Sequence, residues 1–372
     1  MKIVILGLSV TSSWGNGHAT TYRGLMRGLA DRGHDVLFLE RDKPWYAENR
    51  DLPNPRYGRT RLYDSLEDLK TRFAREVRAA DLVMVGSFVP QGTLVSKWIL
   101  AEANGAKAFY DIDTPVTLSK LASGDDEYIS SKLIPQFDLY LSFTGGPTLR
   151  KLEMQYGAKR ARVLYCSVDP LLYYPNRQRR CWDLGYIGTY STDRQAALER
   201  LMIHAAERWQ QGRFLVAGPL YPQSIAWPPN VSRIEHLAPA DHRGFYNSSR
   251  FTLNITRTDM IAAGYSPSVR LFEAAACGTP IISDYWKGLE EIFEPGREVL
   301  VAQSSEDALR FLRETPDPER RRIANRARRR VLAEHTCLQR AAQLEEYALE
   351  LVHSSSARRA PQPPATRDMA RP

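Results

Sequence analysis

The chain has 372 residues, of which 43% are hydrophobic and 25% charged, with a formal net charge of +8. This length fits two domains of about 150–180 residues better than one, and the composition excludes a disordered or fibrous protein. No segment approaches the roughly 20 apolar residues that span a bilayer, and the apolar run after Lys2 is too short for a secretory signal, so we expect a cytoplasmic protein.

Short apolar runs bounded by turn residues recur along the first half of the chain. They are continuous more than alternating, as expected for strands of a parallel sheet that is covered on both faces. The predicted strands are residues 2–8, 35–40, 81–86, 106–111, 138–143 and 162–166. Helical spacing is found in residues 18–31 and 66–79.

The same alternation resumes in the second half. The predicted strands are residues 183–188, 213–218, 231–237, 251–256, 279–284 and 298–302, and helical spacing marks residues 193–209, 269–277 and 318–351. Strands and helices alternate in both halves, which predicts an α/β fold of two facing Rossmann-like domains with a cleft between them.

The segments between and after these elements set the predicted domain boundaries. Residues 167–180 carry Pro and Arg with little periodicity and are predicted as a linker between domains 1–166 and 181–335. A helix over residues 336–352 would return to the first domain. Residues 353–372 have the Ser, Pro and Arg content of a disordered tail.

The basic residues are unevenly distributed. Seven arginines and no acid lie between residues 320 and 330, and residues 353–372 hold four arginines and one aspartate. Such charge could attract nucleic acid or an anionic membrane. A solvated helix face plus a tail is the simpler interpretation, so we expect no specific nucleic-acid partner and keep peripheral membrane contact open. The four scattered cysteines favour reduced thiols.

The first predicted strand ends in a glycine-containing loop that leads to a helix. Gly17 lets backbone N–H groups approach a ligand, and the spacing G-x-G-x-x-T departs from the dinucleotide fingerprint because Thr20 replaces its third glycine. A dehydrogenase is therefore poorly supported. His18 begins the helix at the expected mouth of the cleft, where it could take a proton from an acceptor hydroxyl or simply pack its helix.

A carboxylate is needed to orient such a histidine. Asp111 and Asp113 follow the predicted strand 106–111 and are the candidates, so we expect His18, Asp111 and Asp113 to form the catalytic group. The same residues spell D-x-D, a motif that can hold a divalent metal against a diphosphate. A second Rossmann-like half could supply the phosphate contacts instead, and we expect no metal.

The second half holds a more specific pattern. Gly188, Thr189 and Tyr190 form a turn after a strand, and Arg194 lies at the following helix start, where N–H groups and a cation could neutralise a diphosphate. His236 and Leu237 end another strand and could contact a base. Further on stand Arg257, Tyr265, Ser266, Pro267, Ser268, Val269, Arg270 and Glu273.

This last segment resembles a known family. The stretch Ser266-Pro-Ser…Arg-Leu-Phe-Glu273-Ala-Ala-Ala-Cys-Gly-Thr-Pro-Ile-Ile-Ser-Asp284 is similar to the donor-binding core of group 1 glycosyltransferases, and more closely to their CgeB-like (spore-maturation-like) branch. The resemblance covers residues 160–345 well and residues 1–160 loosely. It implies a GT-B fold in which Glu273 holds the donor ribose, residues 266–270 meet the diphosphate, and residues 236–239 cradle the base.

One position departs from the family pattern. Many retaining members have a glutamate eight residues before the ribose-binding one, and Tyr265 stands there in this chain. A base formed by His18 with Asp111 or Asp113 would favour inversion, whereas a front-face route assisted by the leaving phosphate would retain configuration.

We therefore expect a metal-independent glycosyltransferase without a bound cofactor. Its donor would be a UDP-, GDP- or dTDP-sugar, and its acceptor a hydroxyl of a glycan, a protein or a small molecule. Two alternatives fit the same fold: a nucleotide-sugar epimerase, which needs no acceptor, and a non-catalytic nucleotide-binding or scaffold protein with a basic surface.

Overall fold

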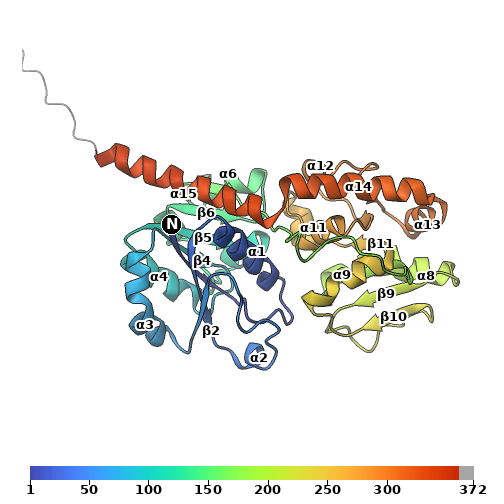
Figure 1. Cartoon of the computed structure of the whole chain (residues 1–372), viewed down its shortest axis with the longest axis horizontal. Coiled ribbons are helices and arrows are strands. Elements are labelled where there is room, and N and C mark those ends of the chain that lie inside the picture. Colours follow the sequence, from blue (N-terminus) through green and yellow to red (C-terminus); the bar gives the residue numbers. More distant parts are fainter. Residues whose placement is uncertain (360–372) are drawn as a thin grey trace, which may run out of the picture.

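The computed structural model describes residues 1–359 and contains two α/β domains that lie side by side (Figure 1). The first domain has a seven-stranded sheet in the order β3-β2-β1-β4-β5-β6-β7, and the second a six-stranded sheet in the order β10-β9-β8-β11-β12-β13. Neighbouring strands run parallel in both sheets. The predicted fold class is confirmed.

The strands of the first domain are β1 (Lys2–Gly7), β2 (Asp35–Arg41), β3 (Arg59–Tyr63), β4 (Leu82–Gly86), β5 (Ala106–Asp111), β6 (Leu139–Ser142) and β7 (Ala161–Val163). Those of the second are β8 (Trp182–Ile187), β9 (Phe214–Ala217), β10 (Val231–Ile234), β11 (Ser249–Asn254), β12 (Ile281–Ser283) and β13 (Leu300–Val301). The sequence did not predict β3, because this strand lies at the edge of its sheet and buries only Tyr63.

Helices connect the strands. In the first domain they are α1 (His18–Asp31), α2 (Pro44–Ala47), α3 (Leu66–Ala79), α4 (Gly92–Glu102), α5 (Thr114–Ala122) and α6 (Pro147–Met154). In the second they are α7 (Thr192–Leu198), α8 (His204–Arg208), α9 (Pro239–Ser248), α10 (Thr258–Ala263), α11 (Val269–Ala276), α12 (Leu289–Ile292), α13 (Ser305–Glu314) and α14 (Asp317–Glu334). A π-helical segment, Glu199–Ile203, joins α7 to α8, and a 3₁₀ turn spans Ile134–Gln136.

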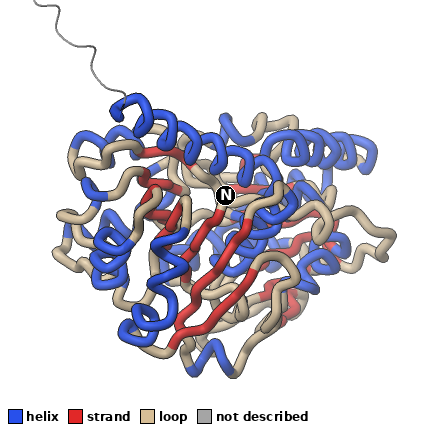
Figure 2. Tube along the Cα trace, turned by 60° about the vertical axis from the view of Figure 1, so that its left-hand side comes forward, coloured by secondary structure: helices blue, strands red, loops and turns tan. Residues whose placement is uncertain are grey.

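Helices cover both faces of the first sheet (Figure 2). Ile3 and Ile5 of β1 belong to the core that contains residues of α1, whereas Val4 and Leu6 belong to a separate core formed with α3 and α4. Because both faces are buried, the strands require apolar side chains at successive positions, which explains their continuous runs in the sequence.

The helical stretch predicted over residues 318–351 is divided in two. It breaks at His335 and Thr336, and α15 (Cys337–Arg359) then crosses to the first domain and packs on α1 (Figure 1). Residues 353–359, which we expected in the tail, thus continue this helix, and the rest of that expected tail lies outside the described residues. In residues 1–359 no helix combines the length and apolar character needed to cross a membrane.

Several arginines of α14 serve the fold. Arg320 is 1% exposed and pairs with Asp317, and Arg330 donates to Glu298 over 2.6 Å. Such intramolecular ion pairs offset the positive charge of this helix. They favour the simpler interpretation of the basic run as part of a folded, solvated helix.

The contact between α1 and α15 gives a test of the fold. A Cβ at Gly28 would lie 2.4 Å from the Cys337 carbonyl oxygen and 2.9 Å from the Cβ of Ala341. We expect Gly28→Ala to lower the free energy of unfolding by about 1–3 kcal/mol, because the added methyl group forces the helices apart. Gly244→Ala in α9 is the control, since a Cβ there would come no closer than 3.8 Å to its nearest neighbour, Gln178, and alanine should be neutral or stabilising. Equal urea midpoints for the two variants would contradict this contact.

Candidate functional site

Each sheet has one point where the strand order reverses. This point lies between β1 and β4 in the first sheet and between β8 and β11 in the second. Open parallel sheets bind ligands beyond the carboxyl ends of their strands at such points. Loops from these edges of the two domains touch each other, since α5 contacts α10 across the boundary. Most of the predicted site residues are found in these loops and at the adjoining helix starts, whereas Asp111 ends β5 and Glu273 lies within α11.

A buried carboxylate holds the loop between β1 and α1. Glu40 is fully buried at the end of β2, and its oxygens accept hydrogen bonds from the Ser9 hydroxyl, the Val10 N–H, and the N–H and hydroxyl of Thr11, over 2.6–3.0 Å. Both oxygens are therefore occupied by the loop. This leaves Glu40 no free oxygen with which to bind a ribose, as a dehydrogenase would need at the end of this strand.

A second brace fixes the later part of the same loop. Arg23 donates to both oxygens of Asp51 (2.7 and 2.9 Å) and to the Val10 carbonyl, and Asp51 also accepts the Ser13 N–H. Burial alone would raise the pKa of Asp51, but the hydrogen bonds and charge of Arg23 outweigh it and leave that pKa below its usual value. A Cβ at Gly17 would meet nothing within 4 Å, so the end of the loop borders open space.

The structure joins His18 to Asp113. The His18 Nε2 atom lies 3.3 Å from the Asp113 Oδ2 atom, and the two side chains are 9% and 19% exposed. Asp113 stands at the N-cap of α5, but its carboxylate makes no capping hydrogen bond. The His18 Nδ1 atom is buried and has no hydrogen-bond partner among the described residues.

Asp111 takes a different position from the one we expected. It is fully buried and accepts hydrogen bonds from the Tyr140 hydroxyl (2.6 Å) and the Thr117 hydroxyl (2.7 Å). Its carboxylate thus lies in the core of the first domain, and Asp113 alone of the two is paired with His18. Within residues 1–359 no group of three or more His, Cys, Asp and Glu residues is placed to hold a metal ion.

In the second domain, Arg270 connects the start of α11 to the ends of β8 and β11. Its Nε atom donates to the Ile187 carbonyl (2.6 Å) and its Nη1 atom to the Asn254 Oδ1 atom (2.9 Å). Ser268 also donates to Asn254. Asn254 was not among the predicted site residues. Its position at the end of a strand next to the switch point is the signal that could have identified it.

The turn after β8 is fixed by a close approach of two loops. A Cβ at Gly218 would lie 2.0 Å from the Gly188 carbonyl oxygen, and Gly218 has a φ of +149°, so this position requires glycine. Tyr190 donates its N–H to the Pro219 carbonyl, and Arg194 donates to the Thr189 carbonyl. The predicted turn residues are thereby held together at the carboxyl edge of the sheet.

Arg257 lies at the end of the neighbouring strand, in the loop between β11 and α10. Its Nε atom is 3.7 Å from the Asp193 carboxylate at the start of α7, and its side chain is 39% exposed. The Thr258 N–H donates to the same carboxylate. Asp193 thus ties together the loops that carry Arg194 and Arg257.

Glu273 is buried in a polar cluster on the other side of α11. It accepts a hydrogen bond from the Tyr246 hydroxyl (2.8 Å) and lies 3.6 Å from His242 Nδ1. His242 Nε2 in turn lies 3.2 Å from the Leu237 carbonyl, which links Glu273 to the loop predicted to hold a base; His236 in that loop is exposed. The i, i+4 spacing of His242 and Tyr246 places them on one face of α9. This spacing is the sequence signal that could have identified them as a pair of neighbouring polar side chains.

The segment from Tyr265 to Pro267 contacts the first domain directly. The Gly145 N–H donates to the Tyr265 carbonyl (2.9 Å), the Thr144 hydroxyl donates to Ser266 (3.0 Å), and the Cys166 thiol donates to the Pro267 carbonyl. Val269 follows as the first residue of α11. Nothing in the sequence pattern indicated that the loop between β6 and α6 would be the partner of this segment.

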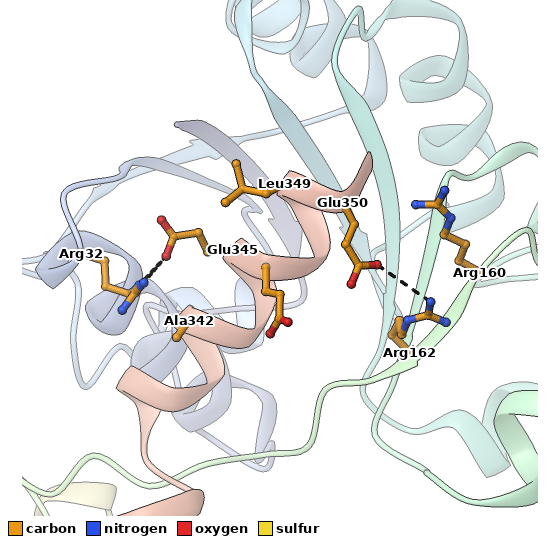
Figure 3. Close-up of a pocket in the computed structure, with 8 residues that line it drawn as sticks. Arg32, Arg160, Arg162, Ala342, Glu345, Leu349 and Glu350 are labelled. Atoms are coloured by element: carbon orange, nitrogen blue, oxygen red, sulfur yellow. Dashed lines mark hydrogen bonds and ion pairs between the residues drawn. The ribbon is translucent and has the colours of Figure 1, made fainter. Parts of the chain in front are cut away.

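A large cavity lies away from these loops. It has a volume of about 750 Å³ and is lined by Arg32, Arg162, Glu345 and Glu350, among others, between α1, β7 and α15 (Figure 3). Arg32 caps the C-terminal end of α1 and His18 is the first residue of that helix, so the cavity lies at the other end of α1 from His18. Ion pairs of Arg32 with Glu345 and of Arg162 with Glu350 cross it. We assign it no function.

The burial of Asp111 predicts a pH-dependent contribution to stability. Burial raises the pKa of Asp111 to about 6, above its unfolded-state value of 3.8. The folded protein therefore holds this proton more tightly, and stability should fall as the pH rises from about 4 to about 6 and then level off. We expect the unfolding free energy of the wild type, measured relative to that of Asp111→Asn, to fall by about 1–3 kcal/mol over this range, because asparagine does not titrate. A difference that is constant from pH 4 to pH 7 would contradict the raised pKa.

Residues 194–346 match a family model described as "Glycosyl transferase-like". Comparison with curated protein sequences gives no match. The family match covers the predicted donor-binding segment and agrees with the glycosyltransferase expected from the sequence.

Solved structures similar to the chain include sucrose-phosphate synthase from Thermosynechococcus elongatus, with 16% identity, a TM-score of 0.68, and coverage of 95% of this chain and 99% of that one. HepE from Anabaena, in complex with UDP and glucose, is 14% identical with a TM-score of 0.70, and the match covers 94% of this chain and 100% of that one. An alpha-glucosyltransferase in complex with UDP is 11% identical with a TM-score of 0.70, and the match covers 94% of this chain and 100% of that one. These likenesses show that the chain has the GT-B fold.

Proposed function

We propose that this chain is a glycosyltransferase that moves a sugar from a nucleoside diphosphate donor to an acceptor hydroxyl without a metal ion. The observation that carries this proposal is the arrangement at the start of α11, where the side chains of Ser268 and Arg270 are hydrogen bonded at the ends of β8 and β11, while the buried Glu273 lies further along the same helix. The family match over residues 194–346 and the complexes of structural neighbours with UDP support it. Membership of the CgeB-like branch is part of the proposal and rests on the resemblance of residues 266–284.

The second domain would bind the donor. The first amides of α11 and the guanidinium of Arg270 supply N–H donors and positive charge for a diphosphate, as helix N-termini do for phosphates. Arg194 and Arg257, from the neighbouring loops, would add charge to the same site. Glu273 would accept hydrogen bonds from the ribose hydroxyls, and the backbone around Leu237 would contact the base. Among UDP, GDP and dTDP, the UDP complexes of the neighbours favour UDP.

The proposed metal-independent reaction requires another source of stabilisation for the leaving group. When the bond from the anomeric carbon to the diphosphate breaks, negative charge develops on the phosphate oxygens. Fixed N–H groups and guanidinium groups stabilise such charge without needing to reorganise. Arg270 is well suited to this role because its hydrogen bonds to Ile187 and Asn254 hold it in place before the donor binds.

The first domain would bind the acceptor beside His18 and Asp113. The acceptor oxygen forms a bond to the anomeric carbon, and its proton passes to this pair or to the departing diphosphate. Of the two side chains, Asp113 is the more exposed, and the buried Nδ1 atom of His18 has no partner. We therefore assign Asp113 as the group that faces the acceptor and His18 as its support, which reverses the order expected from the sequence.

Two competing functions lead to different observations. An epimerase would form product from the donor alone, and a scaffold would bind nucleotide without turnover. We also propose a cytoplasmic location. Contact of the basic residues in 320–330 and 353–372 with a membrane surface is a further part of the proposal. Specific nucleic-acid binding is not part of it, because several arginines of α14, Arg320, Arg322 and Arg330 among them, are engaged in intramolecular ion pairs.

Donor binding can be tested by calorimetry with UDP, GDP, dTDP, ADP and CDP, with and without EDTA. We expect one nucleotide to bind saturably and independently of EDTA, and Glu273→Ala to weaken it at least 10-fold, because the ribose loses its hydrogen-bond acceptor. Glu314→Ala, an exposed glutamate of α13, is the control and should bind like wild type. Binding that requires a metal, or that ignores Glu273, would refute the proposed donor site.

The assignment of the proton acceptor predicts the order of two variants. We expect Asp113→Asn to lower kcat about 10²–10⁴-fold if inversion through a base is the mechanism, with nucleotide affinity unchanged. His18→Gln keeps an N–H donor and should lose less. A larger loss in His18→Gln would restore histidine as the base, and nearly normal rates in both would favour the route through the leaving phosphate. Glu67→Gln on the exposed face of α3 serves as control.

A further inference from the structure

Tyr265 lies at the boundary between the two domains and is bonded to both. It belongs to the second domain, in the loop between α10 and α11. Its carbonyl oxygen accepts the N–H of Gly145 in the first domain over 2.9 Å, and its own N–H donates to the Lys287 carbonyl in the second domain over 2.6 Å. The backbone of this one residue therefore connects a loop of each domain.

The ring of Tyr265 packs on a glycine of each domain. A Cβ at Gly146, the N-cap residue of α6, would lie 2.4 Å from the Cδ2 atom of the ring. A Cβ at Gly288, the N-cap residue of α12, would lie 2.5 Å from the Cδ1 atom, on the other edge. A side chain at either position would displace the ring, so both domains leave room for it.

The backbone at Tyr265 has a conformation that side chains disfavour. Its φ of +50° lies in the left-handed region, which residues other than glycine rarely adopt. Gly146 and Gly288 also have positive φ values, of +54° and +95°. Such strain persists only where the surrounding structure maintains it, and it is concentrated at functional sites. The conformation thus points to a role for the ring at this boundary.

The segment that follows Tyr265 leads directly to the candidate donor site. Ser266 accepts a hydrogen bond from Thr144 of the first domain over 3.0 Å. Two residues later, Ser268 is the N-cap residue of α11, the helix that carries Arg270. The start of α11 is therefore held beside the first domain by the segment in which Tyr265 stands.

The segment that precedes Tyr265 leads to the candidate acceptor site. Helix α10 ends at Ala263, two residues before Tyr265, and it contacts α5 of the first domain. The N-cap residue of α5 is Asp113, the partner of His18. A movement of α10 against α5 would therefore change the separation between the His18–Asp113 pair and the start of α11.

We propose that Tyr265 is a positioning residue that holds the start of α11 at a fixed separation from the His18–Asp113 pair. This inference rests on the proposed function, in which these two groups bind the donor and the acceptor. Transfer needs the acceptor oxygen close to the anomeric carbon, and a displacement of about 1 Å can lower a rate about 10²-fold. The ring provides this placement from the domain boundary and contacts neither substrate. This role differs from the donor contact that the sequence led us to expect.

The experiment measures the separation of the domains by double electron–electron resonance without nucleotide. Spin labels are attached to Glu67→Cys in α3 and Glu314→Cys in α13, both exposed, and Cys181→Ser removes the one native cysteine that is not buried. We expect a narrow distance distribution with Tyr265 and with Tyr265→Phe, which keeps the ring. Tyr265→Ala and Tyr265→Leu should at least double its width, because domains move relative to one another unless their interface prevents it.

Tyr285→Ala is the matched control, since Tyr285 lies in the same loop as Gly288 but is 50% exposed. It should give the wild-type distribution. A broad distribution in Tyr265→Phe, or a narrow one in folded Tyr265→Ala and Tyr265→Leu, would overturn the positioning role. A residue that only stabilised its own domain would lower the urea midpoint without broadening the distances, and this outcome would overturn it too.

Calorimetry with UDP, GDP, dTDP, ADP and CDP on the same proteins separates this inference from the proposed function. Unchanged distances in the Tyr265 variants, together with nucleotide binding by the wild type, would refute the positioning role and leave the transferase proposal intact. Failure of the wild type to bind any of the five nucleotides would refute the transferase, and with it the assignment of a donor site for Tyr265 to position, even where the distances change as expected.

Discussion

The two segments of chain that cross between the domains are hydrogen bonded to each other. The Val168 N–H donates to the His335 carbonyl (3.0 Å), and the Cys337 N–H donates to the Val168 carbonyl (2.9 Å). The domains are thus joined by a paired double crossing, which limits how they can turn relative to one another. The placement of the loops that carry the candidate site depends on this pairing, because those loops belong to two domains that the paired segments hold together.

The double crossing also supports α11. The His335 ring stacks on Phe272, with centroids 4.7 Å apart, and Phe272 lies in α11 between Arg270 and Glu273. Burial, reinforced by the positive charge of Arg340, lowers the pKa of His335 to about 3, so the stacked ring is neutral at physiological pH. Because the uncharged His335 ring packs on Phe272, it holds α11 in place against the segment that crosses between the domains. The groups assigned to the donor are therefore positioned from the crossing as well as from their own sheet.

The sequence indicated the fold well because both sheets are buried on both faces. Each central strand then needs apolar residues at successive positions, and such runs are visible without any structural information. The edge strand β3 escaped because it buries only Tyr63. The segment around Ser268 and Glu273 was recognisable because residues of the types found in the donor-binding core of group 1 glycosyltransferases follow one another within a short stretch of chain.

The candidate site was less accessible to the same reasoning. Asp111 and Asp113 are two residues apart, and which of them enters the core depends on where β5 ends, a boundary that sequence patterns do not define to one residue. Asp111 is the last residue of that strand and is buried, while Asp113 lies beyond it.

The hydrogen bonds from Thr144 and Gly145 to Ser266 and Tyr265 have a thermodynamic consequence. The segment from Tyr265 to Pro267 contacts the first domain and directly precedes the start of α11, which we assign to the donor. Docking of the two domains and binding of the donor therefore both involve this segment. If a donor binds more tightly when this segment is docked on the first domain, docking must be favoured by the same factor when the donor is bound. Domain position and donor occupancy would then report on each other, and the first domain would sense a filled donor site without touching the nucleotide.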